Sequence, residues 1–492
     1  MNALSARFPR TVERLLALGD GARTLDHLVS LEEAWAQRRE PRPQVATTPG
    51  PDAGAHPDYD VILAGGGLSL VYGAYLAHRG LRVAIFDKRR IAVGHREWNI
   101  SRKELAPLRD SGLFSDAELA ELLVMEYDHG ICRWHGGGTW PVRGVLDGVV
   151  DAGRLLSSLR TRAEAASATL LDHHALVGYA VGASGVTVEL DGPDGRRTLT
   201  GRVLVDGLGA ASPHAAFDLC CPTVGGVLLD LDQGQGALQV DPQVGEILVT
   251  TEGLEEDRQH IWEGFPGPGG RFTTYLFYYA EPQQLPPHPL LSLYERFFQT
   301  LPRYKSGPAR LEKATYGFIP AYTRLRPMPV APTARVLLVG DAAGRHSPLT
   351  FCGFGSMIRS FLPVADRLRA CLADERLGQR DLERCWQEPS SLQVMGGLTL
   401  MMVGGRGAKG ARDPSDVNRL LDVAFGTLAE LGNDVYGNFV RDEIGFVDFM
   451  RFMRRTAALR PSIYDEVFAQ LSTGEIARWV WRLGKLGLQK WR

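Results

Sequence analysis

The spacing of hydrophobic and polar positions changes several times along the chain, and each change predicts a different element. Residues 12–37 carry apolar side chains at helical spacing, whereas residues 39–57 contain five prolines and are expected to be an extended linker. A short apolar run at residues 59–64 ends in three glycines, a helix-like stretch covers residues 69–78, and a second apolar run covers residues 83–86. This order predicts a strand, a glycine turn, a helix and a second strand.

Strand patterns dominate the middle of the chain. Asp151 is a suitable N-cap for a helix that ends near residue 166. Strand-like runs follow near residues 169–180, 185–190 and 198–205. The turn DGPDG at residues 191–195 separates the last two runs, so we expect a β-meander there and not a helical crossover.

The second half of the chain changes from strands to helices. Residues 222–325 are rich in strand formers and alternate at residues 271–279 (RFTTYLFYY), which predicts a separate antiparallel sheet. Residues 335–340 return to the pattern of a buried strand, and the chain beyond about residue 355 has a helical pattern. The predicted fold class is therefore α/β, with a Rossmann-like domain, an inserted antiparallel β-sheet and a helical C-terminal region.

These patterns divide the chain into four parts. An N-terminal helical extension and its linker take residues 1–56. The Rossmann-like domain is discontinuous, at residues 57–221 and 326–390, and residues 222–325 form the inserted sheet, which is expected to bind substrate. Residues 391–492 form the helical C-terminal region.

Composition narrows the classes of function. The 492 residues are 44% hydrophobic and 23% charged, which is typical of a globular protein of several domains, and a net charge of −2 without a long basic tract argues against a nucleic-acid partner. The six cysteines lack zinc-type spacing, and the pair His173 and His174 has no companion ligand, so no metal site is expected. Residues 1–40 are charged throughout and no run of about 18 apolar residues occurs, so we expect a cytoplasmic protein without a spanning helix.

The glycine turn carries the first candidate chemistry. Gly65 permits the tight bend, and Gly67 lets a pyrophosphate approach the backbone at the N-terminus of the next helix. Leu70 replaces the third glycine of the G-x-G-x-x-G pattern, and Gly73 is expected to restore close contact between helix and strand. Asp87 ends the second strand, where a carboxylate suits a ribose 2′-hydroxyl and argues against NADP.

Two further turns contain glycine and aspartate. Asp206 lies in the sequence VDGLG at the end of the meander, and Gly340 and Asp341 follow the later buried strand. In flavoproteins of the aromatic-hydroxylase and geranylgeranyl-reductase type, such a Gly-Asp pair lies by the ribityl chain, and the next helix points its N-terminus at the isoalloxazine. The three turns together predict FAD as the cofactor. Other residues expected near FAD are Pro348, Gly353, Gly355 and, toward its phosphates, Arg96.

Four strings make the prediction more specific. They are residues 95–101 (HREWNIS), 245–266 (GEILVTTEGLEEDRQHIWEGFP), 271–279 (RFTTYLFYY) and 340–355 (GDAAGRHSPLTFCGFG). Together, and in this order over roughly residues 57–400, they resemble the CruA/CruP type of flavoprotein lycopene cyclase. The resemblance implies FAD in a geranylgeranyl-reductase-like fold that acts on a carotenoid. The chain departs from the family at Leu70 and at Cys352, where the family pattern has glycine.

The resemblance also implies a redox-neutral isomerisation. A proton adds to the terminal double bond of a linear ψ end, a neighbouring double bond attacks the cation, and loss of a proton leaves a β-type ring. Such a site needs a protonated carboxylic acid, a negative surface near the cation and aromatic walls that exclude water. Reduced FAD supplies the negative surface without net electron transfer, so an external electron donor is expected as a partner.

Candidate residues for this chemistry come from the strings above. Glu263 is the leading acid because its aromatic neighbours in the sequence favour the protonated form of a carboxyl group. Glu97 is the second candidate and Glu281 the third. The residues expected to line a carotenoid tunnel are Trp98, Trp262, Tyr275 and Tyr278.

The C-terminal segment has an amphipathic, basic pattern. Its apolar stripe is Ile476, Trp479, Val480, Leu483 and Leu486, and its polar stripe is Arg478, Arg482, Lys485, Gln489 and Arg492. This pattern is typical of an interfacial membrane anchor and also of a terminal helix docked on its own domain. We expect a protein peripheral to the cytoplasmic membrane, with residues 395–404 at an apolar entrance.

Two other functions remain open at this stage. A carotenoid or prenyl reductase, or a monooxygenase, would use the same FAD scaffold. A non-catalytic carotenoid-binding paralogue would keep the fold, and the departures at Leu70 and Cys352 are compatible with it.

Overall fold

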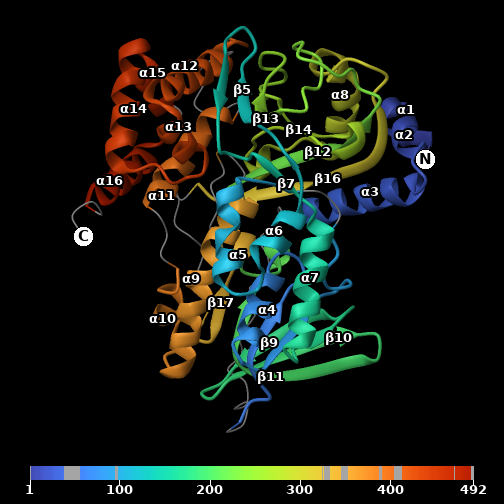
Figure 1. Cartoon of the computed structure of the whole chain (residues 1–492), viewed down its shortest axis with the longest axis vertical. Helices are drawn as coiled ribbons and strands as arrows, with labels where there is room; N and C mark the ends of the chain where they lie inside the picture. The colour runs from blue at the N-terminus through green and yellow to red at the C-terminus, as the bar shows by residue number, and fades with distance from the viewer. Residues whose placement is uncertain are drawn as a thin grey trace.

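The computed structural model describes residues 2–37, 56–94, 98–215, 217–323, 325, 333–344, 349, 353–386, 390–403, 413–469 and 471–488. Figure 1 shows two lobes, with the first sheet in the lower lobe and the second sheet in the upper lobe. The N-terminal helices flank the upper lobe on one side and the C-terminal helices flank it on the other. The predicted linker at 39–57 lies almost wholly outside the described residues.

The first sheet is the predicted Rossmann-like sheet. Its strands are β1 (Tyr59–Ala64), β2 (Val83–Phe86), β8 (Thr169–Leu171), β9 (Ala175–Val181), β10 (Val186–Gly192), β11 (Gly195–Asp206) and β17 (Val336–Leu338). Strands β8, β2, β1, β11 and β17 pair in parallel in that order, and β10 and β9 extend the other half of β11 as an antiparallel meander. The predicted βαβ unit and meander are both confirmed.

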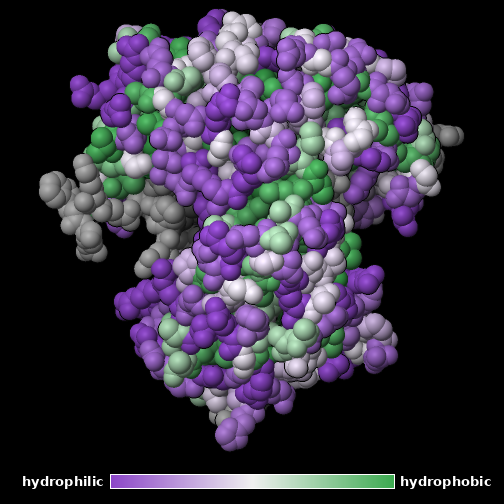
Figure 2. All heavy atoms as spheres, in the orientation of Figure 1, coloured by the Kyte–Doolittle hydropathy of each residue, from purple (hydrophilic) through white to green (hydrophobic). Residues whose placement is uncertain are grey.

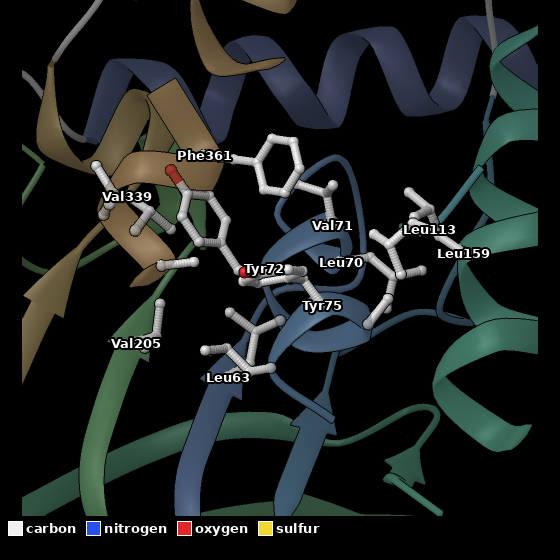
Figure 3. Packing of buried hydrophobic residues seen from close by; sticks show 14 of the residues in the cluster. Leu63, Leu70, Val71, Tyr72, Tyr75, Leu113, Leu159, Val205, Val339 and Phe361 are labelled. Carbon is white, nitrogen blue, oxygen red and sulfur yellow. The ribbon is translucent and has the colours of Figure 1, made fainter. Parts of the chain in front are cut away.

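Three helices cover this sheet, namely α4 (Leu70–His78), α7 (Ala152–Ala165) and α9 (Gly353–Ala373). At Gly73 a Cβ atom would lie 2.6 Å from Ile85 Cδ1, so the missing side chain lets α4 approach β2. Leu70 points instead toward Leu113 and Leu159 (Figure 3). The departure at Leu70 therefore leaves the contact between helix and strand intact, because Gly73 provides it.

The second sheet contains the predicted antiparallel strands and two unexpected ones. Its order is β16 (Arg310–Ala321), β12 (Leu219–Leu229), β15 (Phe272–Phe277), β14 (Ile261–Pro266), β13 (Val244–Val249), β5 (His129–Arg133) and β6 (Thr139–Val142). Strands β5 and β6 come from within residues 57–221, and β12 crosses the boundary predicted at 221 and 222. The boundaries are corrected accordingly, because β5 pairs in parallel with β13 and covers an edge that would otherwise be open.

The remaining elements are short or peripheral to these sheets. A third sheet joins β3 (Trp98–Ile100), β7 (Gly148–Val150) and β4 (Leu123–Glu126), and α5 (Ala106–Asp110) and α6 (Asp116–Leu122) lie near it. The 3₁₀ helices are η1 (Arg102–Leu105), η2 (Gly209–Ala211), η3 (Pro268–Gly270), η4 (Pro282–Gln284), η5 (Gly340–Ala343) and η6 (Thr399–Met402).

The N-terminal helices pack on the second sheet. They are α1 (Asn2–Arg7), α2 (Pro9–Leu16) and α3 (Gly21–Gln37), and they contact α8 (Pro289–Tyr304) and β16. The buried Glu32 of α3 accepts hydrogen bonds from the backbone N–H groups of Leu290 (2.6 Å) and Leu291 (3.1 Å) at the start of α8. Trp35 stacks on Phe318 with ring centroids 4.4 Å apart. These contacts join the N-terminal helices to the sheet.

Replacement of Glu32 by Ala is expected to lower the free energy of unfolding of this layer by about 1–3 kcal/mol, because two buried N–H groups of α8 lose their acceptor. Glu32→Gln keeps one acceptor oxygen and is expected to cost less. Thermal unfolding of the two Glu32 variants measures the loss of stability, and Glu13→Ala, at an exposed site of α2, is the control. Equal melting temperatures for the two alanine variants would contradict the expectation.

A buried histidine beside β14 gives the stability a pH dependence. Burial, followed by Arg296 and Arg258, lowers the pKa of His260 well below 6.5, and its Nδ1 lies 3.6 Å from Glu252 Oε1. The unfolded chain binds a proton near pH 6.5 that the folded chain does not bind. Stability is therefore expected to fall as the pH drops below about 6.5, by up to about 1.4 kcal/mol per pH unit. Denaturant titrations between pH 5 and pH 7 (about two units) should show that the free energy of unfolding changes less with pH in the His260→Gln variant than in the parent protein.

Every element described from residue 353 onward is a helix, as the sequence predicts. They are α9, α10 (Gln379–Glu383), α11 (Ser390–Leu398), η6, α12 (Asp416–Leu431), α13 (Asn433–Val440), α14 (Phe446–Leu459), α15 (Ile463–Phe468) and α16 (Thr473–Leu488). The apolar entrance expected at residues 395–404 is wrong for its described part, because Met395, Leu398 and Met402 are buried in the core between the second sheet and these helices. No helix among the described residues is long and apolar enough to cross a membrane.

Candidate functional site

Two cavities meet where the turns of the first sheet face the second sheet. The first, here the glycine-turn cavity, has a volume of about 520 Å³ and is bordered by Gly65, Gly67, Asp87, Lys88 and Tyr179. The second, here the sheet cavity, has a volume of about 350 Å³ and is bordered by residues of both sheets. Gly207 and Gly209 border both cavities, so the two cavities lie on either side of this turn.

The glycine turn is held by contacts that need glycine. Gly65 has a φ of +112°, and a Cβ atom there would lie 2.5 Å from the carbonyl oxygen of Gly207. A Cβ atom at Gly67 would meet nothing within 4 Å, although Gly67 borders the cavity at the start of α4. The space beside Gly67 is therefore open to a ligand, and the N-terminus of α4 favours an anionic group there.

Asp87 both holds the turn and borders the glycine-turn cavity. Its Oδ2 accepts a hydrogen bond from the N–H of Gly66 (2.8 Å), and its Oδ1 accepts one from the N–H of Arg89 (2.8 Å). Each carboxylate oxygen has a second lone pair, so Asp87 keeps the capacity to accept a hydroxyl hydrogen bond from a ligand.

The structure gives Asp206 a different role from the predicted cofactor contact. Asp206 is 2% exposed and borders neither cavity. Its carboxylate accepts hydrogen bonds from Ser212 Oγ (2.6 Å) and from the N–H of Leu208 (3.0 Å), and burial raises its pKa. Asp206 therefore shapes the turn that carries Gly207 and Gly209.

The Gly-Asp turn and the start of α9 border the sheet cavity together. Gly340 has a φ of +60°, and Gly340, Asp341 and Gly353 line the cavity. Because α9 begins at Gly353, its N-terminus lies at the edge of the cavity, as the sequence predicts. Gly355 has another function: a Cβ atom there would lie 2.8 Å from the carboxylate of Glu104. Arg96, Glu97, Pro348 and Cys352 lie outside the described residues.

The opposite wall comes mainly from strands β14 and β15. Glu263 lies directly across from Tyr275, and both border the sheet cavity with Phe265 and Phe277. Trp98 borders the cavity from β3, and its ring centroid lies 4.8 Å from that of Phe354 at the start of α9. Glu263, Trp98 and Tyr275 therefore meet at one site, and the side chain of Glu263 is half-buried among aromatic residues.

Two predicted wall residues lie elsewhere. Trp262 is 1% exposed and stacks on Tyr304 of α8 with a centroid distance of 4.5 Å. Tyr278 packs in the same core, with its ring centroid 5.6 Å from that of His260. Both predictions are wrong because successive side chains of a strand point to opposite faces, so Trp262 cannot share the face of Glu263. Glu281 caps η4 and borders neither cavity.

The structure adds residues that the sequence analysis missed. Tyr127 Oη donates a hydrogen bond to Asn99 Oδ1 (2.7 Å), and Asn99 borders the sheet cavity. Burial, followed by Glu263 and Asp147, raises the pKa of Tyr127, so the phenol stays a neutral donor. Strand alternation from Tyr275 identifies Phe277, but no local signal marks Tyr127 or Asn99, because they reach the site through the third sheet and its connections.

Several solved structures share this fold, and one of them was solved with FAD bound. A geranylgeranyl bacteriochlorophyll reductase-like protein from Thermoplasma acidophilum is 15% identical, with a TM-score of 0.56 over 84% of this chain and 99% of that chain. The halogenase PltM, solved with phloroglucinol and FAD, is 13% identical, with a TM-score of 0.57 over 88% and 93%. The p-nitrophenol 4-monooxygenase PnpA from Pseudomonas putida is 15% identical, with a TM-score of 0.57 over 80% and 98%.

No protein family and no curated protein matches the sequence. The structural likeness nevertheless shows the fold: this chain shares the Rossmann-type fold of these proteins, the FAD-bound halogenase among them, with a second sheet facing the turns of the first.

Proposed function

We propose that this protein is an FAD-dependent lycopene cyclase that converts linear carotenoid ends to β-type rings. The observation that carries the proposal is the position of Glu263, a carboxyl group beside the aromatic residues of β14 and β15, in a cavity that the Gly-Asp turn and the start of α9 also border. The resemblance of the sequence to the CruA/CruP type supplies the substrate class.

The two cavities fit FAD. Gly67 and the N-terminus of α4 would hold its pyrophosphate, and Asp87 would accept a hydrogen bond from its ribose. Asp341 and the N–H groups at the start of α9 would hold the ribityl and ring portions beside the sheet cavity. When bound and reduced by an external electron donor, FAD supplies a negative ring near a substrate cation without net electron transfer.

The side chains of the sheet cavity match the requirements of the cyclisation. Glu263 is positioned as the general acid that donates a proton to the terminal double bond. Trp98, Phe265, Tyr275 and Phe277 exclude water from the carbocation and offer their ring faces to it. Because one proton is added and one is lost, the ring product has the same mass as the substrate.

Tyr127 positions Asn99, a polar side chain at the border of the sheet cavity. The Tyr127 hydrogen bond holds Asn99 by its amide oxygen. The cavity volume of about 350 Å³ lies near the small end of the usual range of ligand pockets. We therefore expect one end of the carotenoid to enter at a time.

A flavin-dependent reductase or monooxygenase is the second candidate, since proteins of those kinds share the fold. A non-catalytic carotenoid-binding paralogue has less support, because Gly73 maintains the packing that Leu70 was expected to loosen.

Expression of the full chain in a lycopene-accumulating bacterium tests the proposal. Cyclisation gives ring-containing pigments of unchanged mass by chromatography and mass spectrometry. A gain of two hydrogens indicates a reductase, and a gain of one oxygen indicates a monooxygenase. Unchanged lycopene in cells that contain folded, FAD-loaded protein rejects the cyclase.

A further inference from the structure

The last helix, α16, exposes a different set of side chains to solvent from the set that its sequence pattern predicts. Trp479 and Leu486, expected in the membrane-facing stripe, are 5% and 6% exposed and pack in the core of the C-terminal helices. Trp479 Nε1 also donates a hydrogen bond to the carbonyl oxygen of Val394 (3.1 Å). Trp479 and Leu486 of the predicted apolar stripe therefore dock α16 on the protein and are not available to a membrane, whereas Val480 of the same stripe is exposed.

A second set of apolar side chains lies on the outer surface. Val480, Trp481 and Leu488 of α16 are 53%, 57% and 69% exposed, and Val447 at the start of α14 is 45% exposed. Five of the nine large apolar side chains that are exposed among the described residues belong to α14 and α16. Figure 2 shows apolar side chains gathered over this part of the surface, where Figure 1 places α16.

The two helices adjoin where these side chains lie. A Cβ atom at Gly487 would lie 3.3 Å from the ring of Phe446, so the end of α16 lies against the start of α14. Val447 follows Phe446 directly and is exposed at the same end. We call Val447, Val480, Trp481 and Leu488 the C-terminal apolar face.

Basic side chains accompany this face. Lys485 Nζ lies 3.9 Å from the centroid of the Trp481 ring, which places an ammonium group directly over the exposed indole. Arg451, Arg454 and Arg455 are exposed on α14. Two of these three arginines have acidic partners, since Arg451 pairs with Asp448 (3.0 Å) and Arg455 pairs with Glu430 (2.8 Å). Between residues 476 and 488, α16 contains no acidic residue.

We propose that the C-terminal apolar face binds an anionic lipid surface. Trp481, Val480 and Leu488 enter the interfacial region, and Lys485 extends its charge to the lipid phosphates while its stem packs on the indole. The combination of exposed tryptophan, aliphatic side chains and lysine is suited to lipid because the exposed indole of Trp481 lies beside a cation that headgroups attract. The inference goes beyond the proposed function, and it depends on surface chemistry alone.

Vesicle sedimentation with the full chain tests the proposal. The probes are vesicles of phosphatidylcholine alone and of phosphatidylcholine mixed with phosphatidylglycerol. We expect binding to the mixed vesicles that weakens as salt is added, because the attraction to anionic headgroups is screened. The double variant Val480→Ser, Trp481→Ala is expected to bind at least about tenfold more weakly, because it removes the two central apolar groups of the face.

Leu238→Ser is the matched control, since Leu238 is an exposed apolar residue (42%) far from α16 in the chain. It should bind like the parent, and thermal unfolding should show that all variants remain folded. Equal binding by the double variant and the parent overturns the proposal. So does an absence of binding to the mixed vesicles, or self-association that the double variant abolishes without lipid. Because no carotenoid is present, failure of the cyclase proposal would leave these results unchanged.

Discussion

Glu263→Gln is expected to abolish the cyclisation of lycopene, with a loss of about 10²–10⁴-fold in turnover, because the amide cannot donate the initiating proton. Glu263 borders the sheet cavity and lies across β14 and β15 from Tyr275, so glutamine of nearly the same shape should leave the wall intact. The expected phenotype is a folded protein with its full FAD content and almost no ring product.

The control for this variant is Glu281→Gln. Glu281 is buried and, like Glu263, lies near aromatic residues in the sequence, but it caps η4 and does not border the cavity. Turnover of the Glu281→Gln protein should therefore stay near that of the parent. Pigment analysis of both variants, with FAD measured by absorbance, tests whether Glu263 is the acid. Normal cyclisation by Glu263→Gln would remove Glu263 from the role of acid.

Gly67→Val is expected to eliminate FAD binding without unfolding the protein. A Cβ atom at Gly67 meets no protein atom within 4 Å, and Gly67 does not have a positive φ, so the apoprotein should accept the side chain. The added methyl groups would occupy the space at the start of α4 that a pyrophosphate needs. We expect purified Gly67→Val protein to be colourless and to melt at the temperature of the parent apoprotein.

Gly65→Val provides the contrast two residues away. Its Cβ atom would lie 2.5 Å from the carbonyl oxygen of Gly207, and its φ of +112° is unfavourable for valine. This variant should lose both FAD and stability. Full FAD occupancy in the Gly67→Val protein would show that the phosphates do not approach the backbone at this turn, and the proposed position of FAD would have to be abandoned.

Local patterns predicted the part of the site that depends on backbone turns. Gly65, Gly67, Asp87, Gly340, Asp341 and Gly353 all border a cavity, and each occurs at a strand end or helix start that is visible in the sequence. Asp206 occurs in a similar turn but faces inward, toward Ser212. Sequence reasoning could not distinguish these cases, because the direction of a carboxylate depends on which hydroxyl the fold brings beside it.

The sequence by itself determined the order of the elements, the two kinds of sheet and the helical end of the chain, because hydrophobic periodicity and turn residues act over short distances. Only the tertiary structure decided which side chains share a cavity. Strand alternation placed Glu263 and Tyr275 on one face and Trp262 on the other, and packing of α16 buried Trp479 while leaving Trp481 in solvent. Which face of a strand or helix is buried depends on the elements that pack against it, and those elements are far away in the sequence.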